Sequence, residues 1–403
     1  MNLLFSIIRL LTRWAWVGVR LAWNTFSLVI VLSIAATIPV VQFASLGYML
    51  ECSARIANGD PIRKCFPGVA LAGQIVRCGL WTLLTWLPIW LITDLGYSSE
   101  LIQPGTNAAL RLRIVARILS ILWVLWVVWA IWRGGRWKHF FWPHPIRFFK
   151  AIFSKAFWVD VENRWWEFLQ RLHLWRLIKL GFFASLGAWI WLAVPALLIL
   201  VALNAAPEVK PELQGGLVLL GLLGAILMAR AIQYLPTLQT YMAWQSYTKQ
   251  SYPAELASQQ LPIKQRLDGV LDRSAARKVF RQVPIHYAFA NILFLALALP
   301  LYLLRIESIP AELWFLLSIF FVVWMFPARL LIGWMVRRSN RKSNNSRHRE
   351  AWWPLRWIAW VPHLAAIGIY VGFLYLGKFA LWEGGAILLF QHAFLPPVPF
   401  YLR

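Results

Sequence analysis

The stretch at 133–179 reads RGGRWKHFFWPHPIRFFKAIFSKAFWVDVENRWWEFLQRLHLWRLIK and is the longest part of the chain that cannot cross a bilayer. It holds ten lysines and arginines against three carboxylates, with Trp and Phe interleaved throughout. Apolar runs flank it on both sides. Because Lys and Arg concentrate in the cytoplasmic loops of membrane proteins, we expect this basic aromatic segment in the cytoplasm. The side of every other loop follows from that placement.

Part of the basic aromatic segment has the pattern of an interfacial helix, with apolar residues at helical spacing and cations off that stripe. The apolar stripe consists of Ile146, Phe149, Ile152, Phe153 and Phe157. We expect Arg147, Lys150 and Lys155 to contact anionic lipid headgroups, at about 1 kcal/mol for each cation. Interleaved cations and rings can also clamp nucleic acid. The flanking spans favour the membrane, so we expect no nucleic-acid partner.

The composition is that of a membrane protein. The chain of 403 residues is 60% hydrophobic and only 14% charged. A soluble domain carries about a quarter charged residues, so an ordinary soluble domain is excluded. The formal net charge of +24 would indicate nucleic acid in a soluble protein, but here the cations lie between apolar runs. These cations indicate first how the chain is oriented in the membrane. They also indicate anionic lipid or acidic protein partners on the cytoplasmic face.

Runs of about 20 apolar residues predict eight transmembrane helices and an all-α polytopic fold. The predicted spans are 24–50, 79–97, 114–132, 178–204, 213–236, 286–304, 312–336 and 357–382. Residues 1–22 carry three arginines on one face, which predicts an in-plane amphipathic helix ahead of the first span. These charges follow the first apolar run and no small-residue cleavage site appears, so we expect no cleavable signal peptide.

The spans divide the chain into six segments. They are the amphipathic helix 1–22, three spans in 23–132 with a cytoplasmic loop 51–78, the basic aromatic segment 133–179, four spans in 180–336 with a cytoplasmic loop 248–284, a basic linker 337–356, and the last span with a re-entrant or interfacial tail in 357–403.

Two of the predicted cytoplasmic loops differ in character. Residues 262–284 have apolar and charged residues at the spacing of an amphipathic helix, and we expect Arg273, Arg277 and Lys278 to lie in solvent. Residues 337–350 contain no apolar residue, and we therefore expect them to form a disordered tether. Its arginines Arg337 and Arg338 are further candidate contacts for anionic lipid.

The distribution of cations sets the predicted orientation. Predicted inner loops hold 28 lysines and arginines against 10 on the opposite side, with two more inside spans. This asymmetry predicts a multi-pass protein of the bacterial cytoplasmic membrane with both termini outside.

Polar residues inside the predicted spans form a candidate intramembrane site. Charge in hydrocarbon is costly, so Arg230 and Arg329 are functional hypotheses by default, and Gln42 and Gln239 are buried amides that usually join helices by hydrogen bonds. Each arginine lies within about two turns of the inner end of its span, where a long side chain can also snorkel to the interface.

The two arginines receive different expectations. Pro327 and the basic run from Arg337 place Arg329 close to the surface, so we expect its guanidinium to snorkel. For Arg230 the alternatives are even, because Gln233 and Gln239 extend polarity along its helix. Contact with a lipid or substrate is the alternative to snorkelling in both cases.

No residue pattern predicts a metal site, a cofactor or catalysis. Cys52, Cys65 and Cys78 lack a neighbouring ligand at metal spacing, so we expect free thiols. His363 and His392 are expected to be packing residues. The Trp stripe at 123, 126, 129 and 132 indicates a lipid-facing surface or a packing seam. Metalloprotease, phosphate-loop and nucleophile-elbow motifs are missing from the sequence.

Two short segments are similar to known families. GYMLECSARIANGDPIRKCFPG at 47–68 resembles the segment after the first span in uncharacterised prokaryotic multi-spanning membrane proteins, a family of unknown function. That resemblance implies a polytopic topology and no known activity. LDGVLDRSAAR at 267–277 is similar to part of the motif of enzymes that transfer phosphoalcohols from cytidine diphosphate, but the upstream Asp is Gln265 and the paired aspartates that would hold metal are missing downstream.

Two functions fit these observations. The first is a non-catalytic scaffold or interaction protein whose basic cytoplasmic face binds anionic lipid or acidic partners. The second is a transporter or lipid-handling permease with a path near Arg230 and Arg329. A polar cavity enclosed at bilayer depth would favour the transporter or permease over the scaffold.

Overall fold

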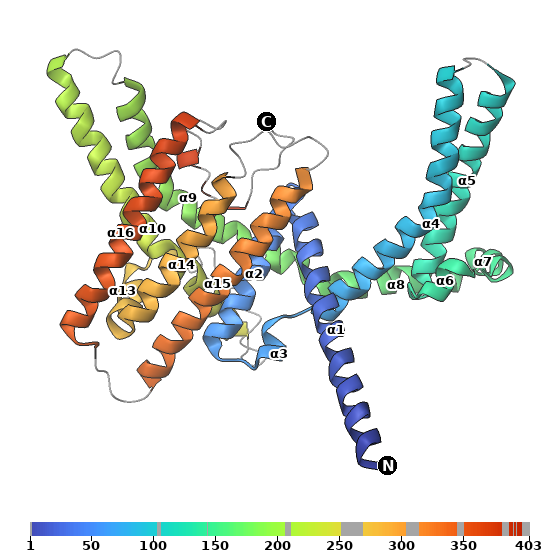
Figure 1. Ribbon diagram of the computed structural model, residues 1–403, viewed down its shortest axis with the longest axis horizontal. Coiled ribbons are helices and arrows are strands. Elements are labelled where there is room, and N and C mark those ends of the chain that lie inside the picture. Colours follow the sequence, from blue (N-terminus) through green and yellow to red (C-terminus); the bar gives the residue numbers. More distant parts are fainter. Residues whose placement is uncertain are drawn as a thin grey trace. The chain divides into compact units, whose positions relative to one another are not determined.

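The computed structural model describes residues 2–102, 106–142, 144–205, 211–250, 269–303, 314–344, 350–380, 387–389, 391 and 393–396. Helices and short turns make up these residues, and none of them forms a strand (Figure 1). The chain divides into two compact units. Unit 1 comprises residues 1–31 and 68–172, and unit 2 comprises residues 32–67 and 173–403.

Eight helical stretches among the described residues are long and apolar enough to cross a membrane. They are Arg9–Thr37, Val69–Ile102, Leu110–Trp132, Lys155–Ala205, Gln214–Thr248, Pro284–Tyr302, Phe315–Ser343 and Trp353–Gly377. The predicted all-helical fold with eight helices of spanning length is therefore confirmed.

The first predicted span, 24–50, is wrong. One helix, α1 (Asn2–Thr37), runs through the predicted boundary at residue 22, and a separate helix, α2 (Gln42–Asn58), follows it. The chain turns between them at Pro39, which has no N–H to continue the helix, and at Val40, which has a φ of 68°. The sequence 1–22 is thus the first part of a long helix, and residues 51–58 of the predicted loop 51–78 belong to α2, where most of them are buried.

Unit 1 is built on a hairpin of two long helices. Helices α4 (Val69–Ile102) and α5 (Asn107–Trp132) pack along each other, and the short α6 (Trp137–Phe141) contacts both (Figure 1). The basic aromatic segment continues as α7 (Pro145–Ile152) and α8 (Lys155–Leu172). The helix breaks at Phe153 and Ser154, so the predicted stripe from Ile146 to Phe157 is divided between two helices.

Unit 2 is organised around α2. Every residue from Ala44 to Ala54 is buried, because α2 packs against α9 (Leu174–Ala205), α10 (Pro211–Gln250) and α15 (Trp314–Asn344). The other elements are α3 (Ile62–Cys65), α13 (Arg273–Gln282), α14 (Pro284–Leu303), which packs on α15, and α16 (Trp353–Ala380), which packs on α14. The described residues of the predicted interfacial tail, 387–389 and 393–396, are mostly buried in this unit.

Glycines let α2 approach its neighbours at backbone distance. A Cβ atom at Gly47 would meet the carbonyl oxygen of Leu177, and one at Gly181 of α9 would meet the carbonyl oxygen of Phe43. Helix α15 approaches α2 in the same way, because a Cβ atom at Gly333 of α15 would meet the backbone of Ser53. Small residues permit such close helix crossings in membrane proteins. The buried carboxylate of Glu51 is paired nearby with Arg55 at 2.6 Å and with Arg176 of α9 at 3.0 Å.

The predicted disordered tether is wrong for residues 337–344, because α15 continues to Asn344. Its last turns make hydrogen bonds to neighbouring helices. Ser339 is 2% exposed and bonds to the side chain of Gln282, and Lys342 donates to the carbonyl oxygen of Gln282 at 2.7 Å. These contacts explain why a run of polar residues stays helical. Residues 345–349 lie outside the described residues.

Candidate functional site

Arg329 is buried in the middle of α15 and is only 1% exposed. Its Nη1 donates to Oε1 of Gln239 at 2.6 Å, and its Nη2 donates to the carbonyl oxygen of Ala393 at 2.9 Å. The guanidinium lies over the ring of Phe294, 5.0 Å from its centroid. The Nε atom is buried without a hydrogen-bond partner among the described residues. A charge in such surroundings depends on the two hydrogen bonds that it makes.

Gln239 completes this cluster from α10. Its Nε2 donates to the carbonyl oxygens of Ala184, at 3.1 Å, and Phe394, at 3.0 Å. Together the Arg329 and Gln239 side chains join α15, α10, α9 and the tail by hydrogen bonds. Side-chain amides commonly join helices in this way. These hydrogen bonds hold together α9, α10, α15 and the tail, which are far apart in the sequence.

The snorkelling expected of Arg329 is wrong. The predicted span ended at residue 336, within two turns of Arg329, whereas α15 continues to Asn344. The side chain leaves α15 on the face that meets α10 and the tail and does not reach an interface. Of the four candidate site residues, the structure brings Arg329 and Gln239 together. Gln42 lies at the start of α2, and Arg230 lies on an exposed face of α10 with its Nη1 3.4 Å from Oε1 of Gln233.

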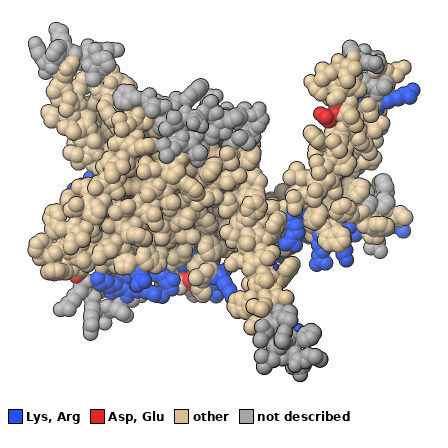
Figure 2. Space-filling model, in the orientation of Figure 1, with Lys and Arg blue, Asp and Glu red and all other residues tan. Residues whose placement is uncertain are grey.

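A basic face covers the end of unit 2 where α15 ends, and we define it by Arg337, Arg338, Arg341 and Lys342. Figure 2 shows Lys and Arg gathered along this end of the unit. Arg337 Nη2 donates to the carbonyl oxygen of Gly59 at 3.5 Å, and Arg338 lies over the ring of Trp334 at 5.4 Å. None of these four cations has a carboxylate partner among the described residues.

Two carboxylates stand near this face. Asp60 follows Gly59 and accepts hydrogen bonds from the Tyr247 hydroxyl at 2.6 Å and from Nδ2 of Asn58 at 2.8 Å. Glu350 bonds to Arg356 and, at 3.4 Å, to Arg281. The hydrogen bond from Arg356 holds the pKa of the Glu350 carboxyl below its usual value. Since Glu350 is already shared between two arginines, it does not offset the charge of the basic face.

The lipid contacts predicted in the basic aromatic segment lie on α7 and α8. Lys150 and Lys155 are exposed there, and the side chain of Arg147 lies outside the described residues. The cations of α8 also pair within the helix, as Arg164 does with Asp160 at 3.0 Å.

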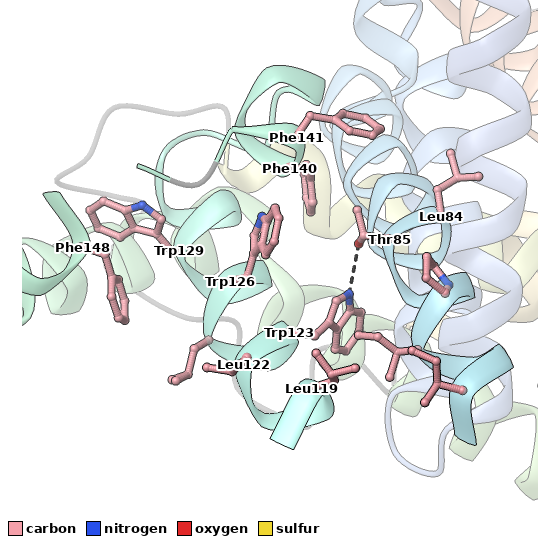
Figure 3. A pocket seen from close by; sticks show the side chains of 14 residues that line it. Leu84, Thr85, Leu119, Leu122, Trp123, Trp126, Trp129, Phe140, Phe141 and Phe148 are labelled. Carbon is pink, nitrogen blue, oxygen red and sulfur yellow. Dashed lines mark hydrogen bonds between the residues drawn. The ribbon is translucent and has the colours of Figure 1, made fainter. Parts of the chain in front are cut away.

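Unit 1 contains an aromatic cleft of about 660 Å³ between α4, α5 and the helices that follow (Figure 3). Trp123, Trp126 and Trp129 of the predicted stripe line it, and Trp123 Nε1 donates to the Thr85 hydroxyl at 3.1 Å. Trp132 does not line it and instead packs edge to face on Phe157. The stripe therefore forms a packing seam with one open apolar side.

A second cleft, of about 800 Å³, lies in unit 2 between α9, α10 and α13. Arg230 reaches it from α10, and Arg273, Arg277 and Arg281 reach it from α13. Arg273 and Arg277 were expected to be solvated, and Arg281 was expected only as one of the cations of an inner loop. The signal in the sequence was their spacing of four residues, which places all three on one helix face.

The cysteines and histidines give no metal centre among the described residues. The three cysteines are free thiols; Cys52 and Cys65 are buried, and burial raises the pKa of the Cys65 thiol. His363 is 1% exposed and packs edge to face on Tyr287 at 5.5 Å, as expected of a packing residue, but neither of its ring nitrogens has a hydrogen-bond partner among the described residues. His392 lies outside the described residues.

Comparison with known proteins gives no relative: no family model, no curated protein and no solved structure matches the chain. The segment 47–68 forms most of α2, all of α3 and the turn before α4. It supplies core residues such as Tyr48, whose hydroxyl donates to the carbonyl oxygen of Pro67 at 2.9 Å.

Proposed function

We propose that the protein is a non-catalytic scaffold of the bacterial cytoplasmic membrane, whose basic face holds anionic lipid headgroups and acidic partners in the cytoplasm. The observation that carries this proposal is that, among the described residues, no carboxylate forms an ion pair with a cation of the basic face. Arg337 and Lys342 donate to backbone carbonyls, and Arg338 and Arg341 are exposed. A fixed array of unpaired cations at the end of a spanning helix attracts anionic headgroups, by about 1 kcal/mol for each cation.

The Arg329 cluster supports a scaffold over a polar path through the same helices. Both terminal nitrogens of the guanidinium are occupied by protein oxygens, and the Gln239 amide is shared among three helices and the tail. A transport site holds polar groups ready for a substrate, and these groups serve to join helices instead.

A lipid-handling permease is the second candidate, and the arginine cleft of unit 2 favours it. Arg230 lies there with three arginines of α13 beside apolar walls. Such a cleft can hold a lipid during transfer as well as a resident lipid, so transport itself is tested by exchange of labelled phospholipid between leaflets of vesicles containing the protein.

The basic face is tested with a variant carrying Gln at Arg337, Arg338, Arg341 and Lys342. In nanodiscs of zwitterionic lipid, we expect its affinity for polyglutamate to fall at least tenfold from that of the unmodified protein, because four unpaired cations are removed. The unmodified protein should itself bind more weakly as salt screens the charges. Fluorescence anisotropy of the labelled peptide measures both effects.

The matched control replaces the same number of cations elsewhere, with Gln at Arg9, Arg13, Arg20 and Arg117. These positions lie on the predicted opposite side, and the control should retain most of the affinity. Equal affinity in the basic-face variant and the unmodified protein would refute the proposed function.

The orientation predicts which engineered cysteines react from outside the cell. In a chain without native cysteines, Cys at Ser154 and at Ser343 should not react with an impermeant maleimide added to intact cells, whereas Cys at Glu208 should react. All three should react after permeabilisation. The physical basis is the excess of Lys and Arg on the predicted inner side. Labelling at Ser154 in intact cells would invert the topology.

A further inference from the structure

The arginine cleft of unit 2 gathers four cations onto one site. On α13, Arg273, Arg277 and Arg281 are spaced by four residues, so they share a face over about 12 Å at about 1.5 Å per residue. Arg230 of α10 lines the same cleft of about 800 Å³. All four side chains are exposed and therefore accessible to a ligand.

Helix α13 is held so that its arginine face lines the cleft. Asp272 caps its start by accepting a hydrogen bond from the Ser274 amide at 2.9 Å. Just before it, Val270 packs against the backbone of Gly187 in α9, and its carbonyl oxygen accepts a hydrogen bond from Trp191 Nε1 at 3.1 Å. The opposite face of α13 is buried through Ala275, Ala276 and Val279. The direction of the arginines is thus set by the core of the unit.

Positive charge in the cleft exceeds what the described residues neutralise. Arg273 lies over the ring of Trp191 at 4.9 Å, and Arg230 is 3.4 Å from the amide oxygen of Gln233. Arg281 shares Glu350 with Arg356. A single shared carboxylate therefore faces four guanidinium groups among the residues that the structure describes. An anion is the ligand that such a site attracts.

The walls of the cleft are apolar and continue as two exposed stripes. Ile190 and Val194 line it from α9, and Leu227 lines it from α10. Beyond the cleft, the α9 face continues through Leu197 and Val201. The α10 face continues through Leu219, Leu222, Leu223 and Ile226, all exposed.

Arg230 marks the end of a purely apolar stretch. Residues 217–229 of α10 contain no polar side chain, and Gln233 and Gln239 follow Arg230. Cations that border exposed apolar helix faces stand where a lipid headgroup meets its acyl chains. The cleft therefore combines both features that an amphipathic anion requires.

We propose that this cleft binds the phosphate of an anionic phospholipid, with the acyl chains along the exposed stripes of α9 and α10. The guanidinium fork matches two phosphate oxygens at once. A free phosphate ester shares that headgroup chemistry but gains nothing from the apolar walls, so the walls favour a lipid. This site is distinct from the basic face and does not rest on the proposed function.

The test is native mass spectrometry of the delipidated full chain in detergent, titrated with phosphatidylglycerol, phosphatidylcholine or glycerol phosphate. We expect phosphatidylglycerol to bind at least tenfold more tightly than either of the others. In the double variant Arg230→Gln and Arg277→Gln, this preference should fall by about tenfold or more, since hydrogen bonds to charged groups are lost. Arg230→Lys keeps the charge and should lose affinity several-fold, because the fork is lost.

The matched control is Arg9→Gln with Arg13→Gln, which removes two exposed cations of α1 and should retain the lipid preference. Melting temperatures and elution volumes verify that each variant is folded. Glycerol phosphate binding as tightly as phosphatidylglycerol would overturn the lipid in favour of a soluble phosphate. An equal loss in the control, or no loss in the cleft variant, would overturn the site, whatever the outcome of the polyglutamate experiment.

Discussion

Arg329→Met is expected to destabilise the protein by about 3 kcal/mol, the scale seen when a buried charged group or its partner is removed. The substitution leaves Oε1 of Gln239 and the carbonyl oxygen of Ala393 without their donor inside unit 2. Gln239→Leu should be comparably damaging, because the guanidinium then stays buried with one hydrogen bond fewer. The two side chains interact directly, so the double variant should cost less than the sum of the single costs, by about 1–3 kcal/mol.

Unfolding in mixed micelles of mild and denaturing detergent measures these differences. The control is Arg341→Met on the same helix, at an exposed position, which should change stability by less than about 0.5 kcal/mol. Additive costs in the double variant would show that the contact between Arg329 and Gln239 is not formed. A neutral Arg329→Lys would restore the snorkelling hypothesis, since Lys reaches an interface as Arg does but cannot make both hydrogen bonds here.

Gly47→Ala is expected to abolish most of the folded yield or to cost more than about 3 kcal/mol, the upper end of ordinary overpacking. The added methyl group would meet the Leu177 carbonyl oxygen, which belongs to the α9 backbone and cannot rotate away. Helices α2 and α9 would have to separate along their whole crossing. Gly181→Ala should have the same effect, because its methyl group would meet the Phe43 carbonyl oxygen.

The matched control is Gly372→Ala in α16, where an added Cβ atom has nothing within 4 Å. Alanine is a better helix former than glycine by about 1 kcal/mol, so this variant should be neutral or slightly more stable. Size-exclusion elution and thermal melting in detergent compare the three variants. Similar melting temperatures for Gly47→Ala and Gly372→Ala would mean that the two helices do not cross at backbone contact.

Seven of the eight helices of spanning length among the described residues could be predicted from hydropathy, because a helix that crosses lipid requires about 20 apolar residues whatever its neighbours are. The first could not be placed correctly. The apolar run continues through 24–50, and hydropathy does not show that Pro39 and Val40 divide it into a spanning helix and the enclosed α2. A proline in an apolar run does not by itself mark a helix end, because Pro88 and Pro195 remain inside helices.

The candidate site was less predictable, since it depends on which face of a helix meets which neighbour. Sequence alone named both Arg329 and Gln239, but the Arg329 guanidinium also bonds to the Ala393 carbonyl of a tail that was expected to be re-entrant or interfacial. For the arginines of α13, the residues of one helix could be predicted but their surroundings could not. Their four-residue spacing is visible in the sequence, whereas the apolar walls come from α9 and α10, and no local pattern connects these helices to α13.

The burial of α2 imposes an order of events during synthesis. Helix α2 ends at Asn58, while its neighbours α9, α10 and α15 begin only at Leu174, Pro211 and Trp314. At about 5–20 residues per second, the ribosome needs about 6–23 s to reach α9 after α2. During that interval the nascent α2 lacks Arg176, the partner from α9 that its Glu51 carboxylate acquires in the finished protein. Until α9, α10 and α15 have been synthesised, α2 therefore lacks the helices that bury it in the finished protein.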